Sequence, residues 1–362
     1  MPLTRFTVRL GILCTFCAVV GQSASVSVPK PPDTRRDNVM ETMHGVAISD
    51  PYRWLEDQES PETRKWIKQQ NDYTHGLLDA RPGRDRLQSR FAELRKVTSI
   101  RLPIERNGRY IYSKRLPDQD QFVIYKRDGA DSKEEVLIDP NPMSEDHSIN
   151  VEPISLSSDG KILLYQLRHG GKDETEIHAF DIDRRQNLPD VLPEALYFDA
   201  SMLPDHSGLY YSMMVPEGPR LRFHKMGDDS KQDVDVFGKG YAKDKAVIGE
   251  VTEDGRYLVI QVWYGSSGDQ IEVWSQDLAA HSELKPLVKD IKARFLPFPG
   301  GNKLYLQTNW KASRGRVLMA DFDDSDPSKW REVIPEAEDA IEAWQSPAAS
   351  SSSATYIMHL PL

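Results

Sequence analysis

Short apolar runs, each preceded by a polar turn that contains glycine, recur along the chain from residue 97 onward. Five such pairs occur, and successive turns are about 46 to 52 residues apart. The turns and the runs that follow them are Asn107-Gly108 with Tyr110-Ile111-Tyr112, Asp159-Gly160 with Ile162-Leu163-Leu164-Tyr165, Ser207-Gly208 with Leu209-Tyr210-Tyr211, Asp254-Gly255 with Tyr257-Leu258-Val259-Ile260, and Gly300-Gly301-Asn302 with Leu304-Tyr305-Leu306. A repeat of this length indicates one structural unit that is used several times.

Further strands follow within each repeat. A second strand of alternating pattern is seen in 176–180 and 270–274, and several repeats add a third, as in 135–138 and 332–334. Three or four strands per unit at this period are typical of β-propeller blades, whose sheets bury their faces against their neighbours. We therefore expect an all-β fold class with an incomplete β-propeller of about five to six blades. The Gly-His and Trp-Asp signatures of WD40 repeats are absent, which indicates another class of propeller.

The pattern before the repeats is helical. In the segment 26–96, Ser60 is a suitable N-cap and Pro61 a suitable first helical residue, after a linker rich in proline (Pro29, Pro31, Pro32). Two stripes at helical spacing follow, the second after a Pro-Gly turn at 82–83. Their members are Trp66, Gln70, Tyr73 and Leu77 in the first stripe and Leu87, Phe91 and Leu94 in the second. We expect two helices here and the incomplete propeller over 97–345.

The first residues have the pattern of a secretory signal peptide over 1–25. Arg5 and Arg9 give a positively charged start, 10–20 is an apolar stretch too short to span a bilayer, and small residues follow. Both cysteines, Cys14 and Cys17, lie inside this stretch and would be removed with it. We expect export to a periplasm or out of the cell, and a mature chain without disulfides.

Composition narrows the range of partners. The formal net charge is -10 and no basic stripe occurs, which disfavours a nucleic-acid partner. No later segment is apolar for long enough to be a membrane span. Asp321, Asp323, Ser325 and Glu332 have the spacing of calcium ligands, but Asp326 stands where a calcium loop needs glycine, so an acidic loop between strands fits better. We expect no metal site and no cofactor.

The end of the chain departs from the repeat. A sixth blade begins near 335–339, but the segment 346–362 is rich in serine and alanine where a blade strand is expected. Such a change is typical of a frameshift or of a misplaced gene end, and a genuine flexible tail is the alternative. An arc that stops here would have an unpaired blade edge.

One motif carries a resemblance to a known family. The run Asp50-Pro51-Tyr52-Arg53-Trp54-Leu55-Glu56-Asp57, the helix start at Ser60-Pro61-Glu62 and the ordered blades together resemble the N-terminal part of a prolyl oligopeptidase. The family usually has Tyr-His-Gly upstream, and Met43-His44-Gly45 stands here. The resemblance implies a seven-bladed propeller inserted between this helical segment and a C-terminal α/β-hydrolase domain. It also implies a monomeric serine peptidase for short proline-containing peptides, and a structural role for Asp50 to Asp57 in fastening the chain start to that domain.

No residue of this chain is expected to be catalytic. The hydrolase chemistry needs a serine in a Gly-x-Ser-x-Gly turn, followed by Asp and His, and that motif does not occur. The nearest run, 265–268, has the wrong spacing and is expected to be a hairpin loop. By resemblance, Phe198 falls where the family places an aromatic residue of the substrate pocket, and Ser267 where some members carry a cysteine. The alternatives are a blade-core aromatic and a solvated hydroxyl.

Two further functions remain open. A propeller without an enzyme half would serve as a non-catalytic module that binds peptides or a protein partner. A glycosidase propeller is disfavoured, because paired carboxylates do not repeat at the same strand ends. The residues do not distinguish an endopeptidase from an enzyme that trims dipeptides.

Overall fold

The computed structural model describes residues 28–343 and 358–359. The expected signal peptide, both cysteines and most of the expected tail at 346–362 lie outside these residues. The chain divides into two compact units, Met1–Arg95 and Lys96–Leu362, which we describe one at a time.

The first unit contains the two expected helices. Helix α1 spans Pro61–Asp79, with Ser60 as its N-cap, since the Ser60 hydroxyl accepts a hydrogen bond from the Thr63 amide at 3.2 Å. Helix α2 spans Arg84–Arg95 and follows the turn at Pro82-Gly83. The predicted N-cap and the predicted turn are therefore confirmed.

The first unit also contains a hairpin that the helical interpretation missed. Strands β1 (Met40–Met43) and β2 (Val46–Ser49) pair in antiparallel fashion around His44 and Gly45. Both turn residues have positive φ, +52° and +81°, which is the geometry of a two-residue hairpin turn whose twist matches the strands. Each strand has only four residues, so its alternation is too short to stand out beside the helices.

Much apolar surface of the first unit is exposed. Leu87, Phe91 and Leu94, the predicted stripe of α2, are all more than half exposed, and both hairpin strands are exposed throughout. Among the described residues of this unit only Thr63 is buried. The unit therefore has almost no core of its own.

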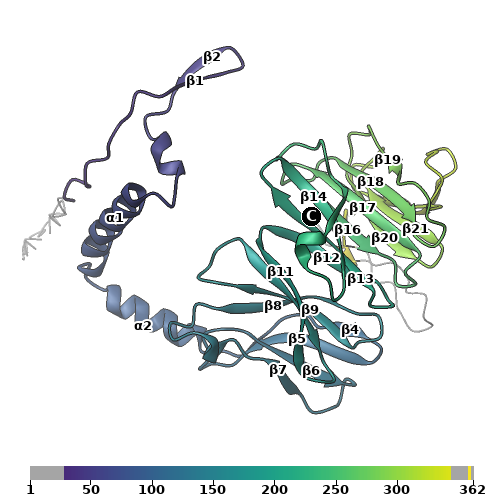
Figure 1. The fold of residues 1–362 in the computed structure, drawn as a ribbon, viewed down its shortest axis with the longest axis horizontal. Coiled ribbons are helices and arrows are strands. Elements are labelled where there is room, and N and C mark those ends of the chain that lie inside the picture. Colours follow the sequence, from purple (N-terminus) through teal and green to yellow (C-terminus); the bar gives the residue numbers. More distant parts are fainter. Residues whose placement is uncertain (1–27, 344–357, 360–362) are drawn as a thin grey trace, which may run out of the picture. The chain divides into compact units, whose positions relative to one another are not determined.

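The second unit consists of successive antiparallel sheets, which run from teal to yellow along the chain in Figure 1. The first sheet contains β3 Ser99–Ile100, β4 Ile104–Arg106, β5 Arg109–Arg115, β6 Val123–Asp128 and β7 Glu135–Ile138. The second contains β8 Asn150–Leu156, β9 Ile162–Arg168, β10 Thr175–Asp181 and β11 Gln186–Ala195. The third contains β12 Tyr197–Met202, β13 Gly208–Val215, β14 Gly218–Lys225 and β15 Val234–Phe237. The fourth contains β16 Lys245–Val251, β17 Tyr257–Tyr264, β18 Ile271–Asp277 and β19 Lys285–Val288, and the fifth contains β20 Phe295–Gly300, β21 Lys303–Thr308, β22 Arg316–Ala320 and β23 Arg331–Ile334.

These sheets are the expected blades. In the second to fifth sheets the strands pair in chain order, and in the first sheet both β3 and β4 pair with β5, which is followed by β6 and β7. Strands at the same edge of neighbouring sheets contact each other, β4 with β8, β8 with β12 and β12 with β16. Short 3-10 helices lie at Arg53–Glu56 (η1), Asn141–Met143 (η2) and Ser230–Gln232 (η3). The prediction of an all-β propeller of about five to six blades is confirmed.

The glycine turns of the repeat have one structural position, between the first and second strands of a sheet. There they bring neighbouring sheets into close contact. A Cβ atom on Gly160 would lie 3.0 Å from the Arg106 carbonyl oxygen, and one on Gly255 would lie 2.9 Å from Cδ of Pro204. Glycine recurs at these two turns because the adjacent sheet occupies the space of a side chain, and because φ is positive at both.

The core lies between the sheets. Four apolar clusters each join two consecutive sheets, and their central members are almost fully buried, for example Ile111, Tyr211, Leu221 and Phe295. This face-to-face burial explains why each repeat needs its neighbours in order to fold.

After the fifth sheet the chain forms one more short pair of strands. Strand β24 (Ile341–Ala343) pairs with β25 (Met358–His359) in antiparallel fashion. A sixth sheet therefore begins after the fifth, and two residues of the expected tail take part in it.

Candidate functional site

Phe198 lies on an inner strand of the arc. It is the second residue of β12, the first strand of the third sheet, and this strand contacts the first strands on both sides. Its side chain is half-buried. The buried core positions of this strand are Ala200 and Met202, which belong to the cluster between the second and third sheets. Phe198 is not a member of that cluster.

Two interacting carboxyl groups lie on β12 and on the neighbouring strand β16. Burial raises the pKa of Asp199, which follows Phe198, to about 6, and the amide of Ala200 opposes that shift. Burial first and the charge of Asp199 second raise the pKa of Glu250 on β16, while Arg106 acts in the opposite direction.

Glu250 is exposed by area, although burial is the largest cause of its raised pKa. The Ser201 hydroxyl of β12 accepts a hydrogen bond from the Val251 amide of β16 at 3.0 Å, which ties the two strands together beside the carboxyl pair.

Ser267 lies in the loop between β17 and β18 and is exposed, as the hairpin interpretation expected. Its hydroxyl donates to the Asp269 carboxylate at 2.9 Å. The loop folds onto Trp263, because a Cβ on Gly268 would lie 2.5 Å from that indole ring. A serine nucleophile needs a base such as histidine within hydrogen-bond reach, and the described hydrogen bonds of Ser267 include none. The structure gives this serine no activated geometry.

The same loop is anchored by a buried acid. Glu272 is 3% exposed, and its carboxylate accepts hydrogen bonds from the hydroxyl groups of Tyr264 at 2.6 Å and Tyr241 at 2.7 Å. The indole of Trp274 donates to it as well. Phe198 and Ser267 belong to different sheets, and no hydrogen bond or ring contact joins them within the residues that the structure describes.

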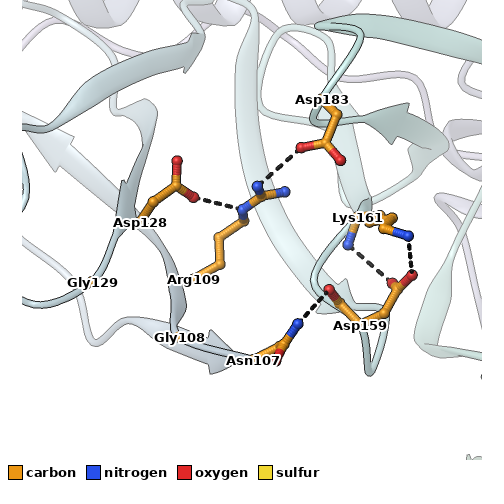
Figure 2. A pocket seen from close by; sticks show the side chains of 8 residues that line it. All are labelled: Asn107, Gly108, Arg109, Asp128, Gly129, Asp159, Lys161 and Asp183. Carbon is orange, nitrogen blue, oxygen red and sulfur yellow. Dashed lines mark hydrogen bonds and ion pairs between the residues drawn. The ribbon is translucent and has the colours of Figure 1, made fainter.

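A polar groove lies between the first and second sheets (Figure 2), with a volume of about 510 Å³. Arg109 lies at its centre and forms ion pairs with Asp128 at 2.8 Å and Asp183 at 2.9 Å, as Figure 2 shows. It also donates to the Gly160 carbonyl. Beside it, Lys161 pairs with Asp159 at 3.4 Å. These charges hold two sheets together, so the groove is a joint between blades.

The family motif at 50–57 holds the first unit together. Arg53, in the short helix η1, forms ion pairs with Asp50 and Glu41, and the Arg53 hydrogen bond lowers the pKa of Asp50. The rings of Trp54 and Trp66 meet edge to face with centroids 6.4 Å apart. The motif therefore connects the hairpin to α1. Whether it also fastens the chain to a hydrolase domain stays a prediction.

Sequence reasoning missed a buried polar network between the second and third sheets. His224 on β14 is 1% exposed and lies between two carboxylates, Asp233 beside β15 and Asp190 on β11. Asp233 also accepts a hydrogen bond from the Tyr211 hydroxyl at 2.8 Å. His224 and Asp190 are 34 residues apart in sequence, and no local signal connects them.

The acidic segment after β22 is held by lysine and arginine side chains. Asp321 forms an ion pair with Lys303, and Glu332 forms one with Arg316. Among the residues described here, no group of three or more His, Cys, Asp or Glu side chains is placed to hold a metal ion. None of the described helices is long and apolar enough to cross a membrane.

Comparison with known proteins matches this arrangement. The family model described as prolyl oligopeptidase, N-terminal beta-propeller domain, matches residues 31–354. The prolyl endopeptidase of Elizabethkingia meningoseptica is 29% identical over 339 residues, which cover 90% of this chain and 47% of that protein. The dual function macrocyclase-peptidase of Galerina marginata is 24% identical, over 85% of this chain and 48% of that protein.

Solved structures match as well. A structure from a study of two prolyl endopeptidases aligns with a TM-score of 0.78 and 28% identity, over 87% of this chain and 48% of the other. The apo prolyl oligopeptidase B of Galerina marginata aligns with a TM-score of 0.61 and 23% identity, which supports the fold alone. The chain spans about half the length of the relatives it matches. It belongs to the prolyl oligopeptidase family and contains that family's N-terminal β-propeller region.

Proposed function

We propose that this chain is the propeller part of an exported prolyl oligopeptidase that acts on short proline-containing peptides. The observation that carries the proposal is the match to the family over residues 31–354, which includes the motif at 50–57 and the first five sheets of the second unit. The names of the relatives favour an endopeptidase over an enzyme that trims dipeptides.

The proposed role of the propeller is to restrict access by size. The first strands of neighbouring sheets, such as β8, β12 and β16, lie against one another. We propose that they form the wall of a narrow passage through which a peptide reaches the active site. Phe198, Asp199 and Glu250 belong to those strands. Extended peptides fit such a passage and folded proteins do not. The selection is steric and needs no catalytic group in this chain.

The reaction itself is acyl transfer through a serine, and we assign it to a hydrolase domain. The sequence has no Gly-x-Ser-x-Gly turn, and the hydroxyl of Ser267 donates to a carboxylate. We therefore expect the chain by itself to be inactive and, like the intact enzyme, monomeric.

A chimera tests this proposal. This chain replaces the matching half of the Elizabethkingia meningoseptica prolyl endopeptidase, and hydrolysis after proline is measured on a short chromogenic peptide and on a folded protein. Cleavage of the peptide alone supports the proposal. A folded chimera that cleaves neither substrate contradicts it, and so does peptide cleavage by the chain without the hydrolase half.

The isolated chain and the chimera also test the second hypothesis, a propeller that binds peptides or a protein partner without catalysis. A monomeric chain that binds proline-containing peptides in a titration, and whose chimera is folded and inactive, would be a binding module.

Export is tested separately, because the pattern at 1–25 predicts it and the structure does not describe those residues. Expression of the full chain in a bacterium should give a protein in the periplasm or medium that begins near residue 26, whereas an intact N-terminus in the cytoplasm would contradict export.

A further inference from the structure

The proline-rich segment at residues 29–35, which we name the strap, is docked along α1. Three side chains of α1 reach it. The Trp66 indole donates to the Thr34 hydroxyl at 2.9 Å, the Gln70 amide donates to the Pro32 carbonyl at 3.4 Å, and the Tyr73 hydroxyl donates to the Pro29 carbonyl. The segment expected to be a linker therefore has specific partners.

The end of the strap is held at Arg35. Its guanidinium lies 4.6 Å from the centroid of the Trp54 ring and forms an ion pair with Glu62 at 2.8 Å. The Trp54 indole donates to the Arg35 carbonyl at 3.1 Å. A cation over an indole face, paired with a carboxylate, is a recognition geometry for arginine.

The donors on α1 are spaced for an extended ligand. Positions 66, 70 and 73 fall on one helix face, and they reach strap residues in the reverse order, so the strap runs antiparallel to the helix. Proline has no amide N–H and favours an extended backbone, which leaves its carbonyl free for such donors. The three α1 side chains and the Trp54 indole therefore donate hydrogen bonds along one extended segment, and most of these bonds end on its backbone carbonyls.

We propose that this face of α1, together with Trp54 and Glu62, is a binding site for an extended proline-rich peptide with an arginine on the C-terminal side of its prolines, and that the strap occupies it in cis. The proposal does not depend on peptidase activity. A tethered ligand has an effective concentration in the millimolar range, so a free peptide of the same sequence competes poorly with it. The site is open to a second peptide only when the strap is displaced.

Binding in trans tests the proposal. In the full chain, Pro29, Pro31, Pro32, Thr34 and Arg35 are replaced by glycine, which removes the proline rings, the Thr34 hydroxyl and the Arg35 guanidinium and should release the strap from α1 without shortening the chain. A fluorescent peptide with the sequence of residues 28–37 is then titrated and followed by anisotropy. We expect saturable binding to the vacated variant, at least tenfold tighter than to the unaltered chain. A peptide with its prolines replaced by alanine should bind at least fivefold more weakly.

Variants on α1 provide the controls. In the vacated background, Trp66→Phe removes one donor and should weaken binding about fivefold, while Gln69→Ala, on an exposed position of the same helix, should leave it unchanged. Absence of saturable binding to a vacated variant with an unchanged circular dichroism spectrum overturns the proposal. Equal binding of the alanine peptide overturns it too.

Proteolysis of the otherwise unaltered chain covers the case in which the vacated variant does not fold. We expect trypsin to cleave slowly after Arg35 while the strap is docked on α1 and faster once the strap leaves it. Trp66→Phe and Tyr73→Phe should accelerate that cleavage several-fold relative to Gln69→Ala. Equal rates in all three variants would overturn the proposal.

Discussion

His224 Nδ1 lies 2.8 Å from Oδ1 of Asp233, and its Nε2 lies 3.2 Å from Oδ1 of Asp190. Asp233 belongs to the third sheet and Asp190 to the second, so one imidazole ring connects two blades. All three side chains are buried. Removal of Asp190 leaves the buried Nε2 of the ring and the Gly227 amide without their hydrogen-bond partner, which is costly.

We expect Asp190→Ala to lower the free energy of unfolding by about 2–5 kcal/mol, because two buried groups lose their acceptor, and the loss is measured by urea denaturation. The control is Glu194→Gln on the same strand, whose exposed pair with Lys172 should contribute at most about 1 kcal/mol. Similar losses in the two variants would show that the buried network does not stabilise the joint between the blades.

Gly255 should not tolerate a side chain. Gly255→Ala places a Cβ 2.9 Å from Cδ of Pro204 at a φ of +73°, so we expect a loss of about 1–3 kcal/mol from the clash, added to the strain of the positive φ. Gly265→Ala in the same sheet has a φ of +69° and no atom within 4 Å. It isolates the backbone strain, about 1–2 kcal/mol. An equal loss of stability in both variants would mean that the contact of the Gly255 turn with Pro204 does not contribute to stability.

Asp199 should make stability fall as the pH rises from about 4 to about 7. Its pKa is raised to about 6 in the folded chain, so the folded state binds more protons than the unfolded state in that window. Asp199→Asn removes the ionisation and should flatten this part of the profile by about 1–2 kcal/mol. The exposed Asp205, whose pKa is lowered by hydrogen bonds from Ser207, serves as the control through Asp205→Asn. An unchanged slope in Asp199→Asn would contradict the assignment.

In the active chimera, Phe198→Ala should lower kcat/KM for a proline peptide about tenfold, the loss of one well-packed aromatic contact of about 1.4 kcal/mol. Ser267→Ala should change it less than twofold, because that hydroxyl is exposed and already donates to Asp269. Urea denaturation of both variants separates an effect on the substrate from an effect on folding. A larger loss of kcat/KM in Ser267→Ala than in Phe198→Ala would assign the substrate contact to the loop at 265–270.

The repeat, the two helices and the family can be predicted from local sequence. Glycine turns such as Asp159-Gly160 and Asp254-Gly255, each followed by a run of apolar residues, depend on local backbone preference and on period, and both can be read from adjacent residues. Ser60 and Pro61 start a helix through contacts with residues adjacent in sequence, so they can be recognised in the same way. The hairpin at 40–49 has equally local causes, but its strands are too short to compete with the helical pattern around them.

The contacts between residues distant in sequence depend on the packing of the folded chain. His224 with Asp190, Asp199 with Glu250, and Tyr73 with Pro29 are pairs whose members lie on different strands or segments, so their contacts depend on how sheets and helices stack. The same holds for the need for glycine at 255, which comes from Pro204 of the neighbouring blade. Burial and charge at these sites are properties of the packed arc, because a side chain is desolvated only when other parts of the chain surround it.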